Sequence, residues 1–434
     1  MPTKRSVLRT SFIALLALTI ILIISTISYT YDYDVQDLKD KIVDKFGKES
    51  PTENQKDPTK EFIEDTSVLN ITDQKVESEY QPISKPMPNL ENENAVLFTL
   101  ARNSDLNGIL QSIKNLESSF NKNYHYPWYF ANNEPFDDEF KTKVDELVSG
   151  EVEFITIPKE YWSYPDFIDL KKAERSRRNA ANAGMMYGDS ESYRHMCRFN
   201  SGFFYKLKEL QKFDYYWRVE PDVKFKCDIN YDVFKKMKQE DKMYGFNMGL
   251  TEDSKTIPTL WDSVKEFMKE NKDLISQPNN LKFISDDDGE TYNMCHFWSN
   301  FEIGSFKFFR SEKYEKFFQF LDSKGGFFYE RWGDAPVHTI AASLLLSPDQ
   351  IQFVANTGYF HHPNQDCPRV DSIREELNCR CSPNRDFTWH RWSCVNKYFE
   401  VNNMEKLNGG IEKRDEIEYQ AMEQRDIMKY LYGL

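Results

Sequence analysis

Residues 215–223 read Tyr215-Tyr216-Trp217-Arg218-Val219-Glu220-Pro221-Asp222-Val223. The aromatic and β-branched first half of this run is typical of a buried β-strand. Pro221 cannot donate a hydrogen bond to a neighbouring strand, so the strand is predicted to end at the two acids. Open α/β sheets bind ligands at the carboxyl ends of their strands. Two carboxylates there suit a Mg²⁺ or Mn²⁺ ion that carries a diphosphate, and a solvated turn with its acids facing water is the alternative.

The segments around this run alternate between strand and helix patterns. Strands are predicted at 95–100, 126–130, 153–157, 215–220 and 244–248, with helices at about 106–120, capped by Ser104, and at 137–147. Such alternation indicates a parallel sheet with crossover helices. The chain contains neither a GxGxxG nor a GxxxxGK[ST] motif, so metal, basic side chains and strand-end loops would have to hold any nucleotide.

The first residues predict a membrane anchor. Lys4, Arg5 and Arg9 precede an apolar run that extends from Phe12 to about residue 30. This run has roughly the 18–20 residues needed to cross a bilayer. A cleaved signal peptide is the alternative, but residues 25–28 make a poor cleavage site. We therefore expect a cytoplasmic tail at 1–11, an uncleaved transmembrane signal anchor at 12–30 and a lumenal remainder.

The lumenal part divides by composition. Residues 31–93 are polar, acidic and dotted with proline, which predicts a flexible stem with one glycosylation sequon, Asn70-Ile71-Thr72. Residues 94–434 are rich in aromatic side chains and long enough to bury a large core, so we expect the catalytic domain there. The net charge of −14 argues against a nucleic-acid partner.

The seven cysteines all lie in the predicted lumenal domain. In an oxidising compartment dispersed cysteines are expected to form disulfides, and an odd count leaves at least one unpaired. Cys379-Arg380-Cys381 lacks the spacing of a zinc knuckle. One basic cluster could be either a solvated helix face or a contact for phosphate; it comprises Lys171, Lys172, Arg175, Arg177 and Arg178.

Five blocks of sequence occur in a fixed order: Tyr193-Arg194-His195-Met196-Cys197-Arg198-Phe199, Trp217-Arg218-Val219-Glu220-Pro221-Asp222-Val223, His296-Phe297-Trp298-Ser299-Asn300-Phe301-Glu302-Ile303, Gly325-Gly326-Phe327-Phe328-Tyr329-Glu330-Arg331-Trp332-Gly333-Asp334-Ala335-Pro336 and Gly358-Tyr359-Phe360-His361. Together they resemble the fungal KTR/Kre/Mnt family of Golgi α-1,2-mannosyltransferases over about residues 94–399. The resemblance implies an α/β, GT-A-like fold with a mixed, largely parallel sheet flanked by helices. It also implies GDP-mannose as donor, Mn²⁺ as metal and retention of the anomeric configuration.

The resemblance also assigns roles to residues. It implies that Glu220 and His361 bind the metal, with His362 as a neighbour easily mistaken for the ligand. A carboxylate and an imidazole are reasonable Mn²⁺ ligands beside two phosphate oxygens. Asp222, the second acid of the opening run, is predicted to contact the cofactor.

Two further carboxylates are predicted to act in catalysis. Glu302 lies in an aromatic setting that predicts burial, and it is expected to be the nucleophile or the stabiliser of a cationic sugar, with a purely structural acid as the alternative. Asp334 is expected to act as a base or to bind sugar hydroxyls, and could also cap the helix that follows it. Retention could proceed through a Glu302 adduct or by attack on the face from which GDP departs.

Two further residues are predicted to contact the substrates, and one acidic run resembles a metal-binding motif. The resemblance places Tyr193 near the reacting sugars and Arg102 near the nucleotide. Asp286-Asp287-Asp288 looks like a metal-binding Asp-x-Asp motif, but the following Gly289 and its polar neighbours favour a surface turn.

The sequence thus predicts a Golgi membrane enzyme that transfers mannose from GDP-mannose, in α-1,2 linkage, to mannose hydroxyls on O- or N-linked glycans of secreted and cell-wall proteins. The rivals are a mannosylphosphate transferase, a transferase of another nucleotide sugar, and a non-catalytic mannan-binding protein of the same fold. A glycoside hydrolase is disfavoured because hydrolysis needs no diphosphate-binding metal.

Overall fold

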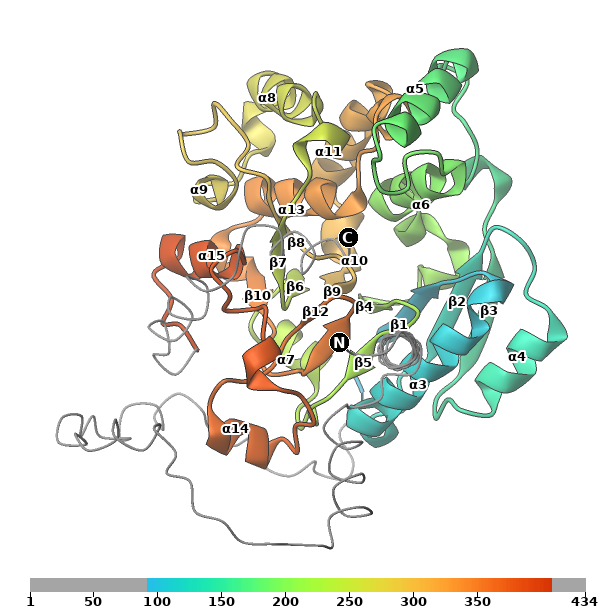
Figure 1. The fold of residues 1–434 in the computed structure, drawn as a ribbon, viewed down its shortest axis with the longest axis vertical. Helices are drawn as coiled ribbons and strands as arrows, with labels where there is room; N and C mark the ends of the chain where they lie inside the picture. The colour runs from blue at the N-terminus through green and yellow to red at the C-terminus, as the bar shows by residue number, and fades with distance from the viewer. Residues whose placement is uncertain (1–91, 408–434) are drawn as a thin grey trace, which may run out of the picture. The chain divides into compact units, whose positions relative to one another are not determined.

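The computed structural model describes residues 92–407 (Figure 1). Its centre is a seven-stranded sheet in the order β10-β6-β9-β4-β1-β2-β3. Strand β9 lies between β6 and β4 and is antiparallel to both of them. Every other neighbouring pair in this sheet is parallel. The strands are β1 (Ala95–Leu100), β2 (Trp128–Asn132), β3 (Val152–Thr156), β4 (Tyr215–Val219), β6 (Tyr244–Phe246), β9 (Phe301–Ser305) and β10 (Ile351–Phe353). The predicted mixed, largely parallel sheet is confirmed.

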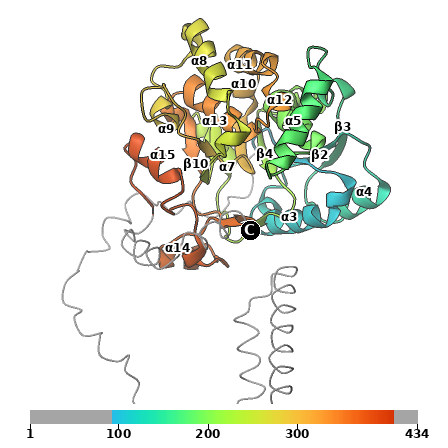
Figure 2. The ribbon, with the colours of Figure 1, turned by 45° about the horizontal axis from the view of Figure 1, so that its top comes forward.

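Helices cover both faces of this sheet, because alternate residues of its central strands point into two separate apolar clusters. Tyr216 belongs to one cluster, whereas Tyr215 and Trp217 belong to the other. Figure 2 shows α3 and α4 on one side of strands β2 and β4, with α11 and α13 on the other. The helices on the first side are α3 (Leu106–Ser119), α4 (Asp138–Asp145) and α7 (Val233–Gln239). Those that contribute to the second cluster include α6 (Glu191–Gly202), α10 (Phe306–Phe309), α11 (Glu312–Ser323) and α13 (Asp334–Leu345).

The remaining helices are α5 (Leu170–Asn182), α8 (Leu260–Glu270), α9 (Leu281–Ile284), α12 (Gly326–Tyr329), α14 (Asp371–Glu376) and α15 (Val395–Val401). They include α8 and α15, which also contribute side chains to the second cluster. β7 (Gly249–Thr251) and β8 (Cys295–Phe297) form an antiparallel pair. A small antiparallel sheet joins β5 (Lys224–Phe225), β11 (Tyr359–His361) and β12 (Asn364–Gln365). Because β5 directly follows the 215–223 run, this sheet brings a distant part of the chain back to the end of β4.

Most predicted elements are present, with shifts of one or two residues at several of their bounds and one corrected helix cap. Ser104 does not cap α3: it lies inside the 3₁₀ turn η1 (Asn103–Asp105), and Asp105 is the residue that precedes the helix. No helix within residues 92–407 is both long and apolar enough to cross a bilayer. The predicted tail, anchor and most of the stem lie outside the described residues.

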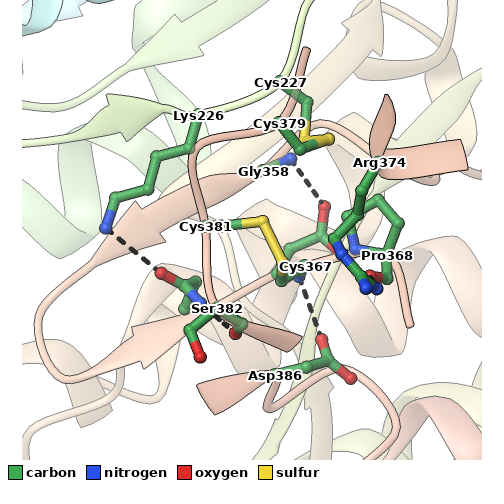
Figure 3. Close-up of a disulfide and its surroundings, with 12 residues drawn as sticks. Lys226, Cys227, Gly358, Cys367, Pro368, Arg374, Cys379, Cys381, Ser382 and Asp386 are labelled. Carbon is green, nitrogen blue, oxygen red and sulfur yellow. Dashed lines mark hydrogen bonds between the residues drawn. A yellow bond between two sulfur atoms is a disulfide. The ribbon is translucent and has the colours of Figure 1, made fainter. Parts of the chain in front are cut away.

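Disulfides fasten the C-terminal part of the domain (Figure 3). The pairs are Cys227–Cys379, Cys295–Cys394 and Cys367–Cys381, which leaves Cys197 as a buried free thiol. The prediction of disulfides with one unpaired cysteine is confirmed. Although the sulfurs of Cys227, Cys379 and Cys381 lie within 4.8 Å of one another, each is used in a disulfide, so they are not free to bind zinc.

Candidate active site

Arg218 joins two predicted site residues at the carboxyl end of β4. Its Nε donates to Oε1 of Glu220 at 2.5 Å, and its Nη1 donates to Oδ2 of Asp334 at 2.5 Å. The guanidinium is largely buried, with 9% of the side chain exposed, against 19% for Glu220 and 7% for Asp334. A buried arginine with two carboxylate partners fixes both of them, because a planar fork of donors imposes direction as well as charge.

Asp334 begins α13 and does not cap it. The residue at the capping position is Gly333, and the hydrogen bonds to the Asp334 side chain come from Arg218 and from the Ser299 hydroxyl at 2.8 Å. The capping alternative is therefore wrong. Burial tends to raise the pKa of Asp334, but Arg218 and His338 outweigh it and lower the pKa below its usual value. The carboxylate is thus ionised, at a helix N-terminus that favours negative charge.

Glu302 lies on β9, directly opposite Arg218 in the antiparallel ladder. It is 1% exposed, and three groups approach its two oxygens: the Tyr216 hydroxyl at 2.5 Å, the Tyr244 hydroxyl at 2.7 Å and Nδ1 of His338 at 2.6 Å. Burial tends to raise the pKa of Glu302, but His338 and Arg218 lower it. The predicted buried setting is confirmed, whereas its role as nucleophile or stabiliser remains a prediction.

His361 ends β11 and faces the Glu220 turn. The register pairs Phe360 with Lys224, so the next residue, His361, lies beside the end of the 215–223 run. Burial lowers the pKa of His361, and the charges of Glu220 and Asp222 act against that shift. His362 is exposed, and its carbonyl is 3.2 Å from Nδ1 of His361.

The geometry of His361 suits a metal ligand. A carbonyl only accepts hydrogen bonds, so Nδ1 carries the proton and Nε2 of the neutral ring presents a lone pair. Metal-binding histidines are commonly oriented in this way by a carbonyl on the other ring nitrogen. Together with the nearby Glu220 carboxylate this makes a nitrogen and oxygen donor set that fits Mn²⁺.

Asp222 shares the turn with Glu220 but is exposed. Its φ of +60° places it in the left-handed region, which aspartate tolerates better than most residues. Its backbone N–H donates to the Gly108 carbonyl at 3.2 Å, and its carboxylate lies against Gly108, where an added Cβ would be 2.7 Å from Oδ1. Glycine at this position of α3 leaves room for the Asp222 carboxylate beside the helix.

Tyr193 and Arg102 each have partners outside the Arg218 network. Tyr193, in the first turn of α6, stacks on Tyr187 with ring centroids 4.4 Å apart, and its hydroxyl accepts from Nη1 of Arg331 at 3.2 Å. Arg102 is 67% exposed and pairs with Asp105 at 3.1 Å. No described contact joins Arg102 to the metal pair, although its charge is close enough to Tyr187 to interact.

Several important residues were not assigned a role from sequence. The sequence marks Arg218 only as part of a strand, although residues two apart on a strand share a face and Arg218 precedes Glu220 by two. His338 lies four residues after Asp334 on α13, so helical spacing could have placed both on one face. Nothing in the sequence marks Tyr216 or Tyr244 as partners of Glu302.

The Asp286-Asp287-Asp288 motif is a surface turn, as predicted. Its three acids are exposed, Asp287 accepts hydrogen bonds from Ser285 and Thr291, and Asp286 pairs with Lys397. The basic cluster of α5 is also mostly exposed, and two of its members form ion pairs, Arg177 with Glu191 and Arg178 with Glu174.

Another buried acid, Asp366, holds the start of the strand that carries His361. Its Oδ2 accepts from the Thr357 N–H at 3.0 Å, the Thr357 hydroxyl at 2.9 Å and the Gly358 N–H at 3.2 Å. Burial, with a smaller contribution from Asp386, raises the pKa of Asp366 to about 7. The folded state therefore binds a proton at pH values where the unfolded chain has lost it.

This linkage makes part of the stability depend on pH. Between the unfolded pKa of about 4 and the folded value, the native state holds more protons, so stability falls as pH rises. From pH 5 to pH 7 we expect Asp366 to remove ~2 kcal/mol from the free energy of unfolding. In Asp366→Asn this contribution should be absent. Urea melts of both proteins at the two pH values measure it, and equal pH slopes would contradict the assignment.

Sequence comparison relates the chain to proteins of known activity. Residues 50–403 match the family model described as glycolipid 2-alpha-mannosyltransferase. Glycolipid 2-alpha-mannosyltransferase 1 of Candida albicans is 54% identical over 315 residues, which cover 73% of this chain and 73% of that protein. Alpha-1,2 mannosyltransferase KTR1 of Saccharomyces cerevisiae is 48% identical over 330 residues, which cover 76% of this chain and 84% of that protein.

Solved structures show the same relationship. Core-mannan synthase A (CmsA/Ktr4) of Aspergillus fumigatus, in a Mn/GDP form, has a TM-score of 0.69 and 37% identity, and the match covers 74% of this chain and 88% of that one. The mannosyltransferase Ktr4p of Saccharomyces cerevisiae, in complex with GDP, has a TM-score of 0.69 and 36% identity over 76% of this chain and 89% of that one. The sequence blocks, the sheet and these matches agree: the chain belongs to the glycolipid 2-alpha-mannosyltransferase family, as its resemblance to the KTR/Kre/Mnt proteins indicated.

Proposed function

We propose that this protein is a GDP-mannose-dependent α-1,2-mannosyltransferase that uses Mn²⁺. Family membership supports the reaction, and the Mn/GDP form of the related core-mannan synthase A supports the metal and the nucleotide. The observation in this chain that carries the proposal is the Arg218 bridge. It ties Glu220, which lies beside a metal-competent His361, to the buried carboxylate Asp334.

In the proposed site Glu220 and His361 would hold Mn²⁺. When bound, the ion offsets the negative charge that grows on the diphosphate as the bond to the sugar breaks. Arg218 keeps the Glu220 carboxylate oriented, and the carbonyl of His362 keeps Nε2 of His361 available. Both fixed partners reduce the reorganisation that ligand binding requires.

Asp334 is proposed to contact the sugars. Both of the hydrogen bonds to its side chain arrive at Oδ2, so Oδ1 is available to accept one from a mannose hydroxyl. The Tyr193 hydroxyl, held by Arg331, is a second polar group near Asp334. Together they would orient a hydroxyl for attack, which is the positioning contribution to such a reaction.

Resemblance to the KTR/Kre/Mnt family supports three finer features of this function. We propose a GT-A-like arrangement, retention of configuration and acceptors that are mannose-terminated O- or N-linked glycans. The apolar run at 12–30 and the basic residues before it support a single-pass Golgi membrane protein with a lumenal catalytic domain.

The direct test uses the full chain, purified in detergent, with GDP-mannose, Mn²⁺ and α-methyl mannoside. We expect an α-1,2-linked disaccharide and release of GDP, identified by linkage analysis. A product that carries mannose phosphate would identify a mannosylphosphate transferase instead. Binding of mannan with no GDP released under any divalent metal would indicate a non-catalytic binding protein.

A further inference from the structure

The ring of His338 lies between two hydrogen-bond acceptors in the interior of the domain. Its Nε2 is 3.0 Å from the backbone carbonyl of Asn200, and its Nδ1 is 2.6 Å from Oε2 of Glu302. A carbonyl oxygen cannot donate, so Nε2 carries a proton. The second contact also requires a proton, which lies either on the histidine or on the glutamate.

The surroundings of Glu302 place that proton on the histidine. The hydroxyls of Tyr216 and Tyr244 each bond to a different oxygen of Glu302, and Arg218 stands directly opposite it. Hydrogen bonds and a cation around a carboxyl group favour its ionised form. His338 and Glu302 are therefore an imidazolium and a carboxylate, each 1% exposed.

The charged and titratable groups facing His338 agree with this state. They are Glu302 on β9, Asp334 on the same helix, Arg218 and Tyr216 on β4, Tyr244 on β6 and Tyr314 on α11. Burial tends to lower the pKa of His338, but Glu302 and Asp334 outweigh it and raise the pKa. The two carboxylates thus keep the imidazole charged.

This network leaves Glu302 poorly placed to attack a sugar. A nucleophile must present a free lone pair to the anomeric carbon at about 3–3.5 Å. Both oxygens of Glu302 are engaged by buried partners, and the side chain is 1% exposed. Asp334 differs, because both of the hydrogen bonds to its side chain go to one oxygen.

We propose that Glu302 is a positioning residue, held in place by the imidazolium of His338, and that it acts through Arg218 on Glu220 and Asp334. The inference rests on the proposed mannosyl transfer. The physical basis of the proposal is the charge balance among the linked charged side chains. Arg218 and His338 carry two positive charges, while Glu302, Asp334 and Glu220 carry three negative ones, so the set has a net charge of −1 before a divalent ion binds. Attack on the face from which GDP departs then needs no adduct with Glu302.

The first test measures the charge of His338 and needs no turnover. Histidine-selective ¹⁵N NMR of the full chain at pH 7 should show one ring protonated on both nitrogens, assigned by its loss in His338→Asn. In Glu302→Gln the same ring should become neutral, because the amide removes the charge that holds the proton. A neutral His338 in the wild type would overturn the proposal.

The second test separates positioning from attack. Glu302→Gln should lower kcat by about 10–100-fold, as expected for a residue that orients groups touching the ligand. Its KM for GDP-mannose should stay near the wild-type value, and its kcat should follow a different pH profile. Asp334→Asn, the matched variant, should lose about 10³-fold. Loss of all transfer in Glu302→Gln, with unchanged melting temperature and GDP affinity, would contradict the proposal.

The third test looks for an open nucleophile position. In Glu302→Ala, azide could occupy the space of a missing nucleophile and form a C1–N bond as the C1–O bond to GDP breaks. We expect no mannosyl azide, and its formation would overturn the proposal.

If Glu302→Ala does not fold, a different experiment replaces the azide test. The wild type is allowed to turn over a GDP-mannose analogue with fluorine at C2 of the sugar, and its peptides are then mapped for a covalent adduct. An adduct on the Glu302 peptide contradicts the proposal, and turnover without one supports it. A wild type that transfers no mannose would instead refute the proposed function, and the NMR result would still stand.

Discussion

Replacement of Glu220 by glutamine is expected to lower kcat/KM for mannose transfer by about 10³-fold. Glutamine keeps the shape of the side chain but removes the charge that would bind Mn²⁺ and that pairs with Arg218 at 2.5 Å. The Mn²⁺ concentration for half-maximal rate should rise in parallel, because the loss is one of metal binding. Initial rates of the full chain across a Mn²⁺ titration measure both effects.

The control for this variant is Asp288→Asn in the acidic surface turn. Asp288 has a φ of +56°, which asparagine tolerates, and it is exposed. Its activity and Mn²⁺ dependence should match those of the wild type. His361→Ala should behave like Glu220→Gln. If either of these two variants kept wild-type transfer, the metal pair would be assigned incorrectly.

Replacement of Arg218 by methionine is expected to destabilise the fold by roughly 3–5 kcal/mol and to abolish most of the activity. The change leaves Glu220 and Asp334 without their shared partner, and Asp334 is buried with 7% of its side chain exposed. An unpaired charge in that position is costly, and neither acid is then held in place. Urea denaturation measures the first effect, and specific activity of the folded protein measures the second.

Arg198→Met provides the matched control for Arg218→Met. Arg198 forms a similarly buried pair with Asp322, through two hydrogen bonds of 2.7 Å between α6 and α11. Its loss should lower stability by a comparable amount without a comparable loss of specific activity. Arg218→Lys should keep the charge but satisfy only one acid well, so it should fall between methionine and the wild type. Equal activities for Arg218→Met and Arg198→Met would mean that Arg218 is only structural.

The local sequence pattern was sufficient to predict where many of the strands lie. The run at 95–100 became β1 with the predicted bounds, and β4 ended one residue before Glu220, where Pro221 stops pairing. Strand β2 began two residues later than predicted, at Trp128. These elements were predictable because buried strands and their breakers are encoded within a few neighbouring residues.

Long-range features were not predictable in the same way. The direction of β9 depends on which strands it lies between. The sequence around Glu302 therefore predicts that its side chain is buried, but not the antiparallel pairing that places Glu302 opposite Arg218. The disulfide pairs join cysteines up to 152 residues apart, and their connectivity follows only from the fold. The two tyrosines and the histidine around Glu302 come from three separate elements, and no spacing in the chain links them.

The metal site is the central claim, and anomalous scattering from Mn²⁺ in crystals of the protein grown with GDP tests it most directly. We expect one strong peak with a Glu220 carboxylate oxygen and Nε2 of His361 both at roughly 2.0–2.3 Å, and with the diphosphate on its open side. A peak that binds GDP but lies beyond coordination distance of both side chains would contradict the account.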